Sequence, residues 1–254
     1  MALLEISGLV QAFGGLVAVD QLDLSVEDGR IFGLIGPNGS GKSTVFNCIS
    51  RFYQPQSGGI RFNGKNLLKM KPHQVVRIGI ARTFQNLELF ENLTVLENLL
   101  VAHHTHFRSK LPGCALNLPR SRREERAARE AALEILRLLD LAQYAEEKVP
   151  SLPLGMRRRV EMARALVTRP RLILLDEPAS GLNHREIDHL TETLRDVNDR
   201  FKVTILLVEH NMNIVMSLCE RIAVMNFGKK IAEGTPEEVR SHPEVVTAYL
   251  GEKK

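Results

Sequence analysis

The sequence predicts an α/β fold, built as one domain over residues 1–254. Three observations carry this prediction. Short apolar runs typical of strands covered on both faces recur at 30–35, 172–175 and 203–208. Segments with a helical spacing of apolar residues separate these runs. A glycine-rich loop joins the first of these runs to a segment with helical spacing.

Composition excludes several classes of protein. The chain is 44% hydrophobic and 25% charged, and its apolar residues recur throughout, which excludes intrinsic disorder. We expect no secretory signal, and no run approaches the roughly 18 apolar residues of a membrane span. A net charge of +4 gives no reason to expect nucleic acid as a partner. The three isolated cysteines, Cys48, Cys114 and Cys219, predict a reducing cytoplasm.

The first sixty residues predict short β segments separated by turns. Residues 22–26 alternate apolar and polar side chains, as a half-buried strand does. Residues 30–35 are more continuously apolar and lead directly into the glycine loop at 36–44. A helical spacing begins at Val45, so the predicted order is strand, glycine loop, helix.

A helical insertion is predicted over about residues 86–165. Ser121 and Glu124 have the spacing of a capping box, and an amphipathic helix is expected to begin there. The apolar stripe of this helix is Ala128, Ala131, Ala132, Ile135, Leu138, Leu139 and Ala142. Five arginines against two glutamates at 120–129 predict a solvated helix face, with a partner-binding patch as the alternative. Three histidines match no usual zinc spacing and are expected to be solvated: His103, His104 and His106.

The last third of the chain predicts a βαβ unit and a hairpin. A predicted helix at 185–198 separates the apolar strands at 172–175 and 203–208. The hairpin is expected to pair residues 221–224 with 230–233 around a turn at 226–229.

The glycine loop carries the strongest chemical signal in the sequence. It matches G-x-x-x-x-G-K-[ST] at every fixed position. Its glycines let backbone N–H groups converge on phosphate oxygens, and the following helix N-terminus adds favourable partial charge. Lys42 would neutralise the β- and γ-phosphates, and Ser43 would offer its hydroxyl to Mg²⁺. The predicted nucleotide-binding residues of the loop are Gly36, Pro37, Asn38, Gly39, Ser40, Gly41, Lys42, Ser43 and Thr44.

Two acids follow the strand at 172–175. Asp176 and Glu177 would lie at the carboxyl edge of the sheet, where open α/β sheets bind their ligands. Asp176 can hold Mg²⁺, usually through water, while Glu177 can orient or deprotonate an attacking water. Together with the glycine loop, this pair predicts a P-loop nucleoside triphosphatase.

Five further elements, in order, resemble the ATP-binding cassette (ABC) family. The most diagnostic resembles the family signature, usually LSGGQ followed by a basic helix, and here it is Leu152, Pro153, Leu154, Gly155 and Met156. Gln85 matches the glutamine of the Q-loop, and His210 matches the switch histidine. Phe13 lies where the family places an aromatic ring under adenine. The D-loop is matched by Ser180, Gly181, Leu182 and Asn183.

Several stretches are closer still to the ATPase subunits of branched-chain amino-acid importers. They are residues 12–16, 81–85, 208–212, 233–236 and 243–251. The signature departs from the ABC pattern, because Pro153 and Met156 replace its serine and glutamine. In the family, the serine hydroxyl meets the γ-phosphate held by the opposite subunit, and proline has neither hydroxyl nor N–H to offer. The backbone of Gly155 and the helix N-terminus remain available.

The resemblance implies a RecA-like P-loop core with an antiparallel β subdomain, a helical subdomain at about 86–165 and a C-terminal helical tail at about 235–254. It implies ATP hydrolysis with ATP and Mg²⁺ as cofactors. The residues implied in catalysis are Gln85, Glu177 and His210, and those implied in placing Mg²⁺ are Ser43, Gln85 and Asp176.

The partners implied by the resemblance are transmembrane permease subunits, a second ATPase subunit (a copy or a paralogue) and a periplasmic or extracellular substrate-binding protein. The implied location is the cytoplasmic face of a bacterial-type membrane. The alternatives are an ATPase subunit of a lipid or lipopolysaccharide exporter, and a soluble ABC ATPase that acts on ribosomes or DNA. After Gln85, residues Leu87, Leu89 and Phe90 either pack inward or line a groove for a short helix of the membrane subunit.

Overall fold

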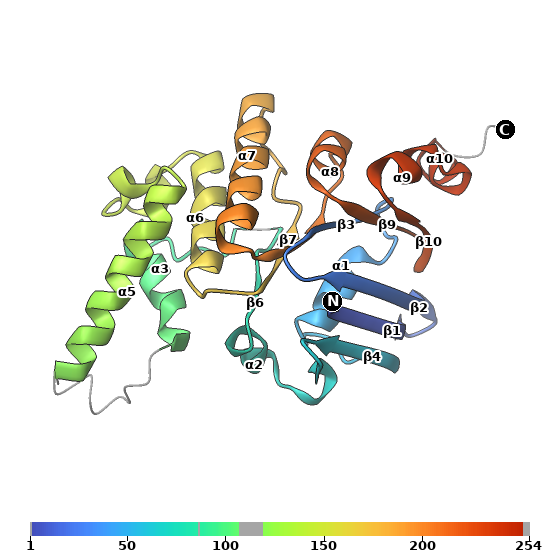
Figure 1. Cartoon of the computed structure of the whole chain (residues 1–254), viewed down its shortest axis with the longest axis horizontal. Helices are drawn as coiled ribbons and strands as arrows, with labels where there is room; N and C mark the ends of the chain where they lie inside the picture. Colours follow the sequence, from blue (N-terminus) through green and yellow to red (C-terminus); the bar gives the residue numbers. More distant parts are fainter. Residues whose placement is uncertain (1, 86, 107–118, 251–254) are drawn as a thin grey trace.

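A six-stranded, mostly parallel sheet forms the centre of the structure, which is a computed structural model that describes residues 2–85, 87–106 and 119–250 (Figure 1). The strand order is β10-β9-β3-β8-β7-β6, and β10 runs antiparallel to β9. The strands are β3 (Ile31–Ile35), β6 (Ile80–Arg82), β7 (Leu172–Asp176), β8 (Thr204–Val208), β9 (Arg221–Asn226) and β10 (Lys229–Gly234). The predicted βαβ unit and terminal hairpin are both present.

A second, antiparallel sheet has the order β2-β1-β4-β5. Its strands are β1 (Ala2–Phe13), β2 (Leu16–Glu27), β4 (Ser57–Phe62) and β5 (Lys65–Asn66). The prediction of short segments was wrong for β1 and β2, which each run for 12 residues. Register irregularities between Ile6 and Leu9, and again before Ala12, interrupt the alternation of apolar and polar residues, so the strands look shorter in sequence than they are.

The central sheet separates two hydrophobic cores. Helix α1 (Lys42–Ile49) lies between the two sheets, and the side chains of Phe32 and Leu34 belong to the core on that side. Ile31 and Ile35, which alternate with them along β3, belong to the core formed with the helices of the opposite face. Burial on both faces explains why these strands are almost uniformly apolar.

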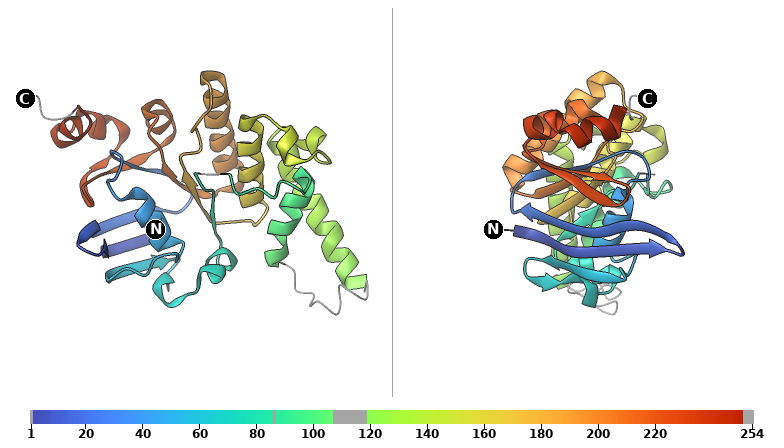
Figure 2. Two further views of the ribbon diagram at one scale, coloured as in Figure 1. Left: turned by 180° about the vertical axis from the view of Figure 1, so that it is seen from behind. Right: turned by 90° about the vertical axis from the view of Figure 1, so that its right-hand side faces the viewer.

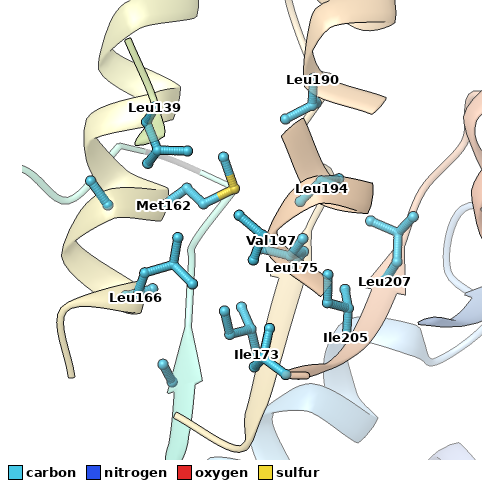
Figure 3. Packing of buried hydrophobic residues seen from close by; sticks show 14 of the residues in the cluster. Leu139, Met162, Leu166, Ile173, Leu175, Leu190, Leu194, Val197, Ile205 and Leu207 are labelled. Atoms are coloured by element: carbon cyan, nitrogen blue, oxygen red, sulfur yellow. The ribbon is translucent and has the colours of Figure 1, made fainter. Parts of the chain in front are cut away.

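Helices α3 (Val95–His103), α5 (Pro119–Leu138) and α6 (Leu154–Leu166) pack against one another beside the central sheet (Figure 2). Helix α7 (His184–Phe201) joins their core to β7 and β8. Figure 3 shows Met162 and Leu166 of α6 facing Leu194 and Val197 of α7 above the sheet. The helical insertion therefore packs against the sheet through one continuous apolar core.

Three details of the insertion differ from the sequence-based expectations. Helix α5 begins at Pro119, so Ser121 lies inside the helix instead of capping it, because proline suits the first helical position. The helix ends at Leu138, since Asp140 adopts a left-handed conformation (φ 54°), and Ala142 falls in a separate 3₁₀ turn. His103 is buried, because it continues the buried stripe that Val95 and Leu99 begin on α3.

His104 is exposed as expected, and the side chain of His106 lies outside the described residues, as does Cys114. The arginines of α5 whose side chains are described are all exposed: Arg122, Arg123, Arg126, Arg129 and Arg137. The remaining helices are α2 (Pro72–Arg77), α8 (Met212–Leu218), α9 (Pro236–Ser241) and α10 (Pro243–Leu250). In the parts of the chain that the structure describes, no helix has both the length and the apolar character needed to span a membrane.

Candidate functional site

The glycine loop connects β3 to α1 in a conformation that requires glycine at two positions. Gly36 has a φ of 149°, and a Cβ atom there would collide with the carbonyl oxygen of Met225. Gly41 has a φ of 106°, and a Cβ atom there would collide with the carbonyl oxygen of Ala18. The loop therefore folds tightly against β2 and β9, and α1 starts at Lys42, directly after Gly41, with the Ser43 side chain exposed.

Lys42 is buried, with its side chain turned back along the loop. Its Nζ donates to the carbonyl oxygens of Gly36 (2.8 Å) and Pro37 (2.9 Å) and lies 3.3 Å from the Ser40 hydroxyl. Burial lowers the pKa of the Lys42 ammonium, while the nearby carboxylates of Glu177 and Asp176 act to raise it. The ammonium is thus held by weak neutral acceptors at a place where phosphate oxygens would be stronger partners.

Asp176 ends β7 and is paired with a residue that sequence reasoning did not assign. Its Oδ2 lies 2.9 Å from Nη2 of Arg82, the last residue of β6, and both side chains are largely buried. Burial raises the pKa of the Asp176 carboxyl, and the hydrogen bond and charge of Arg82 oppose that rise.

The donors predicted for Mg²⁺ fit the chemistry of that ion. Ser43, Asp176 and Gln85 offer a hydroxyl, a carboxylate and an amide oxygen, and hard oxygen donors of this kind suit Mg²⁺. Among the described residues, no cluster of three or more His, Cys, Asp or Glu could form an all-protein metal cage. Mg²⁺ commonly keeps several waters and binds through one or two carboxylates together with substrate phosphates.

Gln85, Glu177 and His210 meet at the carboxyl edge of the sheet. The Gln85 Nε2 donates to Glu177 Oε2 (2.9 Å), and the His210 Nε2 lies 2.8 Å from Glu177 Oε1. The three residues follow β6, β7 and β8, which are adjacent in the sheet, and this adjacency brings them together. Glu177 has a φ of 49°, an uncommon conformation for a side chain of its size and one that is enriched at functional sites.

Phe13 lies at the end of β1 and is 45% exposed, so one part of its ring is free to take a planar partner. Its ring centroid is 5.1 Å from that of Tyr53, in an edge-to-face arrangement. Sequence reasoning missed Tyr53, since a single tyrosine after a helix carries no distinctive signal. The pair makes an aromatic surface suited to a purine base.

The signature residues start α6 and contact the D-loop of the same chain. Pro153 occupies the N-cap position of the helix without providing a side-chain cap. A Cβ atom on Gly155 would lie 2.6 Å from Glu186 Oε1, and one on Gly181 would lie 2.9 Å from Leu154, so these segments pack closely. Asn183 caps α7 by accepting from the backbone N–H of Glu186. Leu152 of the signature belongs to the core on the helical face of the sheet, whereas α1, which follows the glycine loop, packs in the core on the other face.

Two buried carboxylates that sequence reasoning missed anchor the functional loops. Glu209 accepts from the backbone N–H of Ala179 (2.8 Å) and of His210 (3.0 Å), so it ties the D-loop to the segment of the switch histidine. Glu161 of α6 accepts from the N–H of Phe84 (3.0 Å), directly before Gln85. The only signal available was the position of these acids beside recognised motifs.

The C-terminal helix lies near the glycine loop. A cavity of about 770 Å³ lies between residues 37–40 of the loop, the β9–β10 turn at Asn226 and Phe227, and α10. The α10 residues that line it are Pro243, Glu244, Thr247 and Ala248. Sequence reasoning described this segment only as a tail, whereas the structure places it beside the proposed nucleotide site.

Comparisons with known proteins agree with this geometry. A family model described as ABC transporter matches residues 19–180, and one described as branched-chain amino acid ATP-binding cassette transporter matches residues 229–254. The high-affinity branched-chain amino acid transport ATP-binding protein BraF of Pseudomonas aeruginosa is 45% identical over 250 residues, which are 98% of each chain. Its counterpart LivG of Escherichia coli K12 is 43% identical over 250 residues, with the same coverage.

Solved structures extend the likeness to three dimensions. The ADP conformation of MJ1267, an ATP-binding cassette of an ABC transporter, has a TM-score of 0.86 and 34% identity, covering 99% of this chain and 100% of that one. The dimeric post-hydrolysis state of the cassette MJ0796 bound to ADP and Pi has a TM-score of 0.77 and 25% identity, covering 92% and 98%. The chain therefore belongs to the ABC transporter family, and it is an ATP-hydrolysing transporter subunit that carries the C-terminal domain of the branched-chain amino-acid type.

Proposed function

We propose that this chain powers the import of branched-chain or related amino acids. The names of its relatives BraF and LivG and the family match of residues 229–254 support this cargo class. The observation that carries the ATPase chemistry is the convergence of Gln85, Glu177 and His210 beside the glycine loop. The proposed class of cargo is supported by the relatives, and the proposed ATPase chemistry by residues of this chain.

The proposed roles follow from where the side chains lie. Phe13, with Tyr53 at its edge, stacks on adenine, and Lys42 leaves the loop carbonyls to contact the phosphates. Glu177 orients and polarises the attacking water, because its carboxylate lies at the sheet edge between Gln85 and His210. Ser43, Asp176 and Gln85 would hold Mg²⁺, which when bound neutralises phosphate charge.

We also propose that the working unit contains two cassettes, arranged head to tail. The signature and the glycine loop belong to separate parts of one chain, so a second copy or a paralogue would complete each site. Related cassettes have been solved as dimers. The N-terminus of α6 would then face the partner's γ-phosphate through backbone N–H groups, because Pro153 contributes no donor.

The proposed partners are permease subunits that span the membrane and a substrate-binding protein on its outer side. The proposed location of the chain is the cytoplasmic face of the membrane. ATP-driven closure of the two cassettes and their reopening after hydrolysis would bias the conformation of the permease, through differential binding of ATP to the two states.

Uptake of labelled leucine in cells that lack this chain tests the proposal. Restoring the wild-type chain should restore uptake, while Lys42→Ala, produced at the same level, should not. Permease subunits should co-purify with both chains from solubilised membranes. Unaltered uptake with a defect in lipid or lipopolysaccharide export would favour the exporter, and co-purification with ribosomes or DNA would favour a soluble ABC ATPase.

A further inference from the structure

Arg82 occupies a buried position where three functional segments meet. Its Nη1 donates to Asn47 Oδ1 of α1 (2.7 Å), and its Nη2 donates to Asp176 Oδ2 of β7 (2.9 Å). The guanidinium lies 5.0 Å from the ring centre of Phe84 and 5.5 Å from that of Phe46. One side chain thus touches the helix after the glycine loop, the strand that ends in Asp176 and the residue before Gln85.

Stability alone does not account for this arrangement. A buried ion pair is often no more stabilising than apolar residues of the same volume, and a buried donor without a partner is unfavourable. The Nε of Arg82 is buried and has no hydrogen-bond partner among the described residues. The guanidinium is therefore oriented toward the Asn47 and Asp176 side chains at the expense of complete hydrogen bonding.

The Arg82–Asp176 pair precedes the Gln85–Glu177 contact on the same two segments: Arg82 comes before Gln85, and Asp176 comes directly before Glu177. Strands β6 and β7 are paired in parallel, with Arg82 opposite Leu174, and the N–H of Thr83 donates to the carbonyl of Leu174 (3.0 Å). Strand β6 ends at Arg82, while β7 continues to Asp176 beside β8. The Arg82–Asp176 hydrogen bond therefore joins the two segments just before the Gln85–Glu177 contact. The bridge limits how far Gln85 and Glu177 can move apart.

We propose that Arg82 is a positioning residue that holds Gln85 and Glu177 in register with Asp176 and α1. This inference rests on the proposed function, because it assumes that Glu177 and Gln85 act on ATP. Arg82 acts through these residues and not on the nucleotide. A planar guanidinium can donate hydrogen bonds to Asn47 and Asp176 at the same time, through Nη1 and Nη2. A lysine ammonium would keep the positive charge but not this pair of fixed donors.

The test uses Arg82→Lys in the full chain. We expect kcat for ATP to fall roughly 10- to 100-fold, as small misplacements of catalytic groups do. The affinity for ATP in EDTA, which depends on Lys42 and the loop, should change by less than about 2-fold, and the thermal midpoint should change little. Arg51→Lys is the matched control, because Arg51 is anchored by the carbonyls of Met70, Tyr53 and Leu68 and touches no carboxylate of the site.

A double-mutant cycle with Gln85→Ala separates positioning from general damage. If Arg82 acts through the Gln85–Glu177 contact, the two losses in kcat should combine to much less than their product. Multiplicative losses, or equal loss of metal-free ATP affinity and kcat in Arg82→Lys, would overturn the inference. If Arg82→Lys fails to fold, Asn47→Ala is the second variant, because it removes one hydrogen-bond partner of Arg82 without a charge change. It should lower kcat less than the roughly 10- to 100-fold expected of Arg82→Lys, again without a change in metal-free ATP affinity. Absence of ATP hydrolysis by the wild-type chain would instead contradict the proposed function.

Discussion

Lys42 shows how the burial of one side chain affects the electrostatics of this site. Its ammonium is buried against two backbone carbonyls and a hydroxyl, although two carboxylates lie close enough to influence its pKa. A buried charge without a close ionic partner is unfavourable, and a phosphate would supply that partner. In the proposed function, a bound phosphate would therefore relieve the unfavourable electrostatic energy of the buried Lys42 ammonium.

Lys42→Ala should reduce ATP affinity by about tenfold or more, because a hydrogen bond to a charged group contributes about 1.5–3 kcal/mol. Turnover should fall as well. Equilibrium binding of a fluorescent ATP analogue to the purified chain measures the first effect, and phosphate release measures the second. Near-normal hydrolysis by a folded variant would show that this loop is not the site.

At the scale of the elements, the segment between β6 and α3 is held by hydrogen bonds at Gln85 and at Phe90. Arg158 of α6 donates to the carbonyl of Gln85 (2.8 Å), and the buried Asn98 of α3 bonds to the backbone of Phe90 at both its N–H and its carbonyl. Phe90 is nevertheless half exposed, and Leu87 and Leu89 are partly exposed. A loop with fixed ends and accessible apolar side chains suits the predicted docking of a short helix from the membrane subunit.

Phe90→Asp should weaken assembly with the membrane subunits and leave the isolated chain folded, since half of the side chain is already in water. The measurement is the yield of permease subunits that co-purify with the variant, beside circular dichroism of the isolated chain. Phe52→Asp is a useful comparison, because Phe52 is exposed to a similar degree and follows α1. Unfolding of the isolated Phe90→Asp chain would show that the residue is part of the core instead.

At the scale of the whole molecule, the glycine loop and the signature are fixed to different parts of one framework. The loop belongs to the region where α1 lies between the two sheets, and the signature begins a helix of the opposite core. Both cores share the central sheet, which holds the loop and the start of α6 at different places in the framework. Completion of the site is therefore expected from a second cassette.

Glu177→Gln should bind ATP and retain it, because the amide preserves the size of the side chain but cannot act as a base. Retained ATP should then stabilise a dimer, visible as a doubling of mass in light scattering when ATP is added. The same sample without nucleotide is the control and should stay monomeric. Rapid hydrolysis by Glu177→Gln would mean that a different residue activates water.

Pro153→Ser, introduced into the Glu177→Gln chain, should strengthen this dimer. A serine hydroxyl would add a hydrogen bond to the γ-phosphate of the partner's ATP, and about 1.5–3 kcal/mol corresponds to roughly 10- to 150-fold in dimer affinity. The opposing effect is the greater flexibility of the loop once proline is removed. Analytical ultracentrifugation over a range of protein concentrations decides between them, and an unchanged or weaker dimer would show that the missing donor is not limiting.

The sequence by itself determined the elements whose signals are local. The glycine loop, the apolar strand before it, the helix after it and the acids that end and follow β7 were all predictable, because their spacing reports backbone conformation and chemistry directly. The true lengths of β1 and β2, the burial of His103 and the start of α5 were not, since irregular register and packing against distant segments override local pattern.

Only the tertiary structure decided which of these residues meet. The strand order β8-β7-β6 brings His210, Glu177 and Gln85 together from loops that are far apart in the chain, and no local pattern encodes that order. The contacts of Arg82, Tyr53 and Glu209 were not predictable for the same reason, because their partners Asp176, Phe13 and Ala179 are distant in the sequence. The proximity of α10 to the glycine loop is also a long-range contact, because the loop lies in the first fifth of the chain and α10 follows the β9–β10 hairpin in the last part.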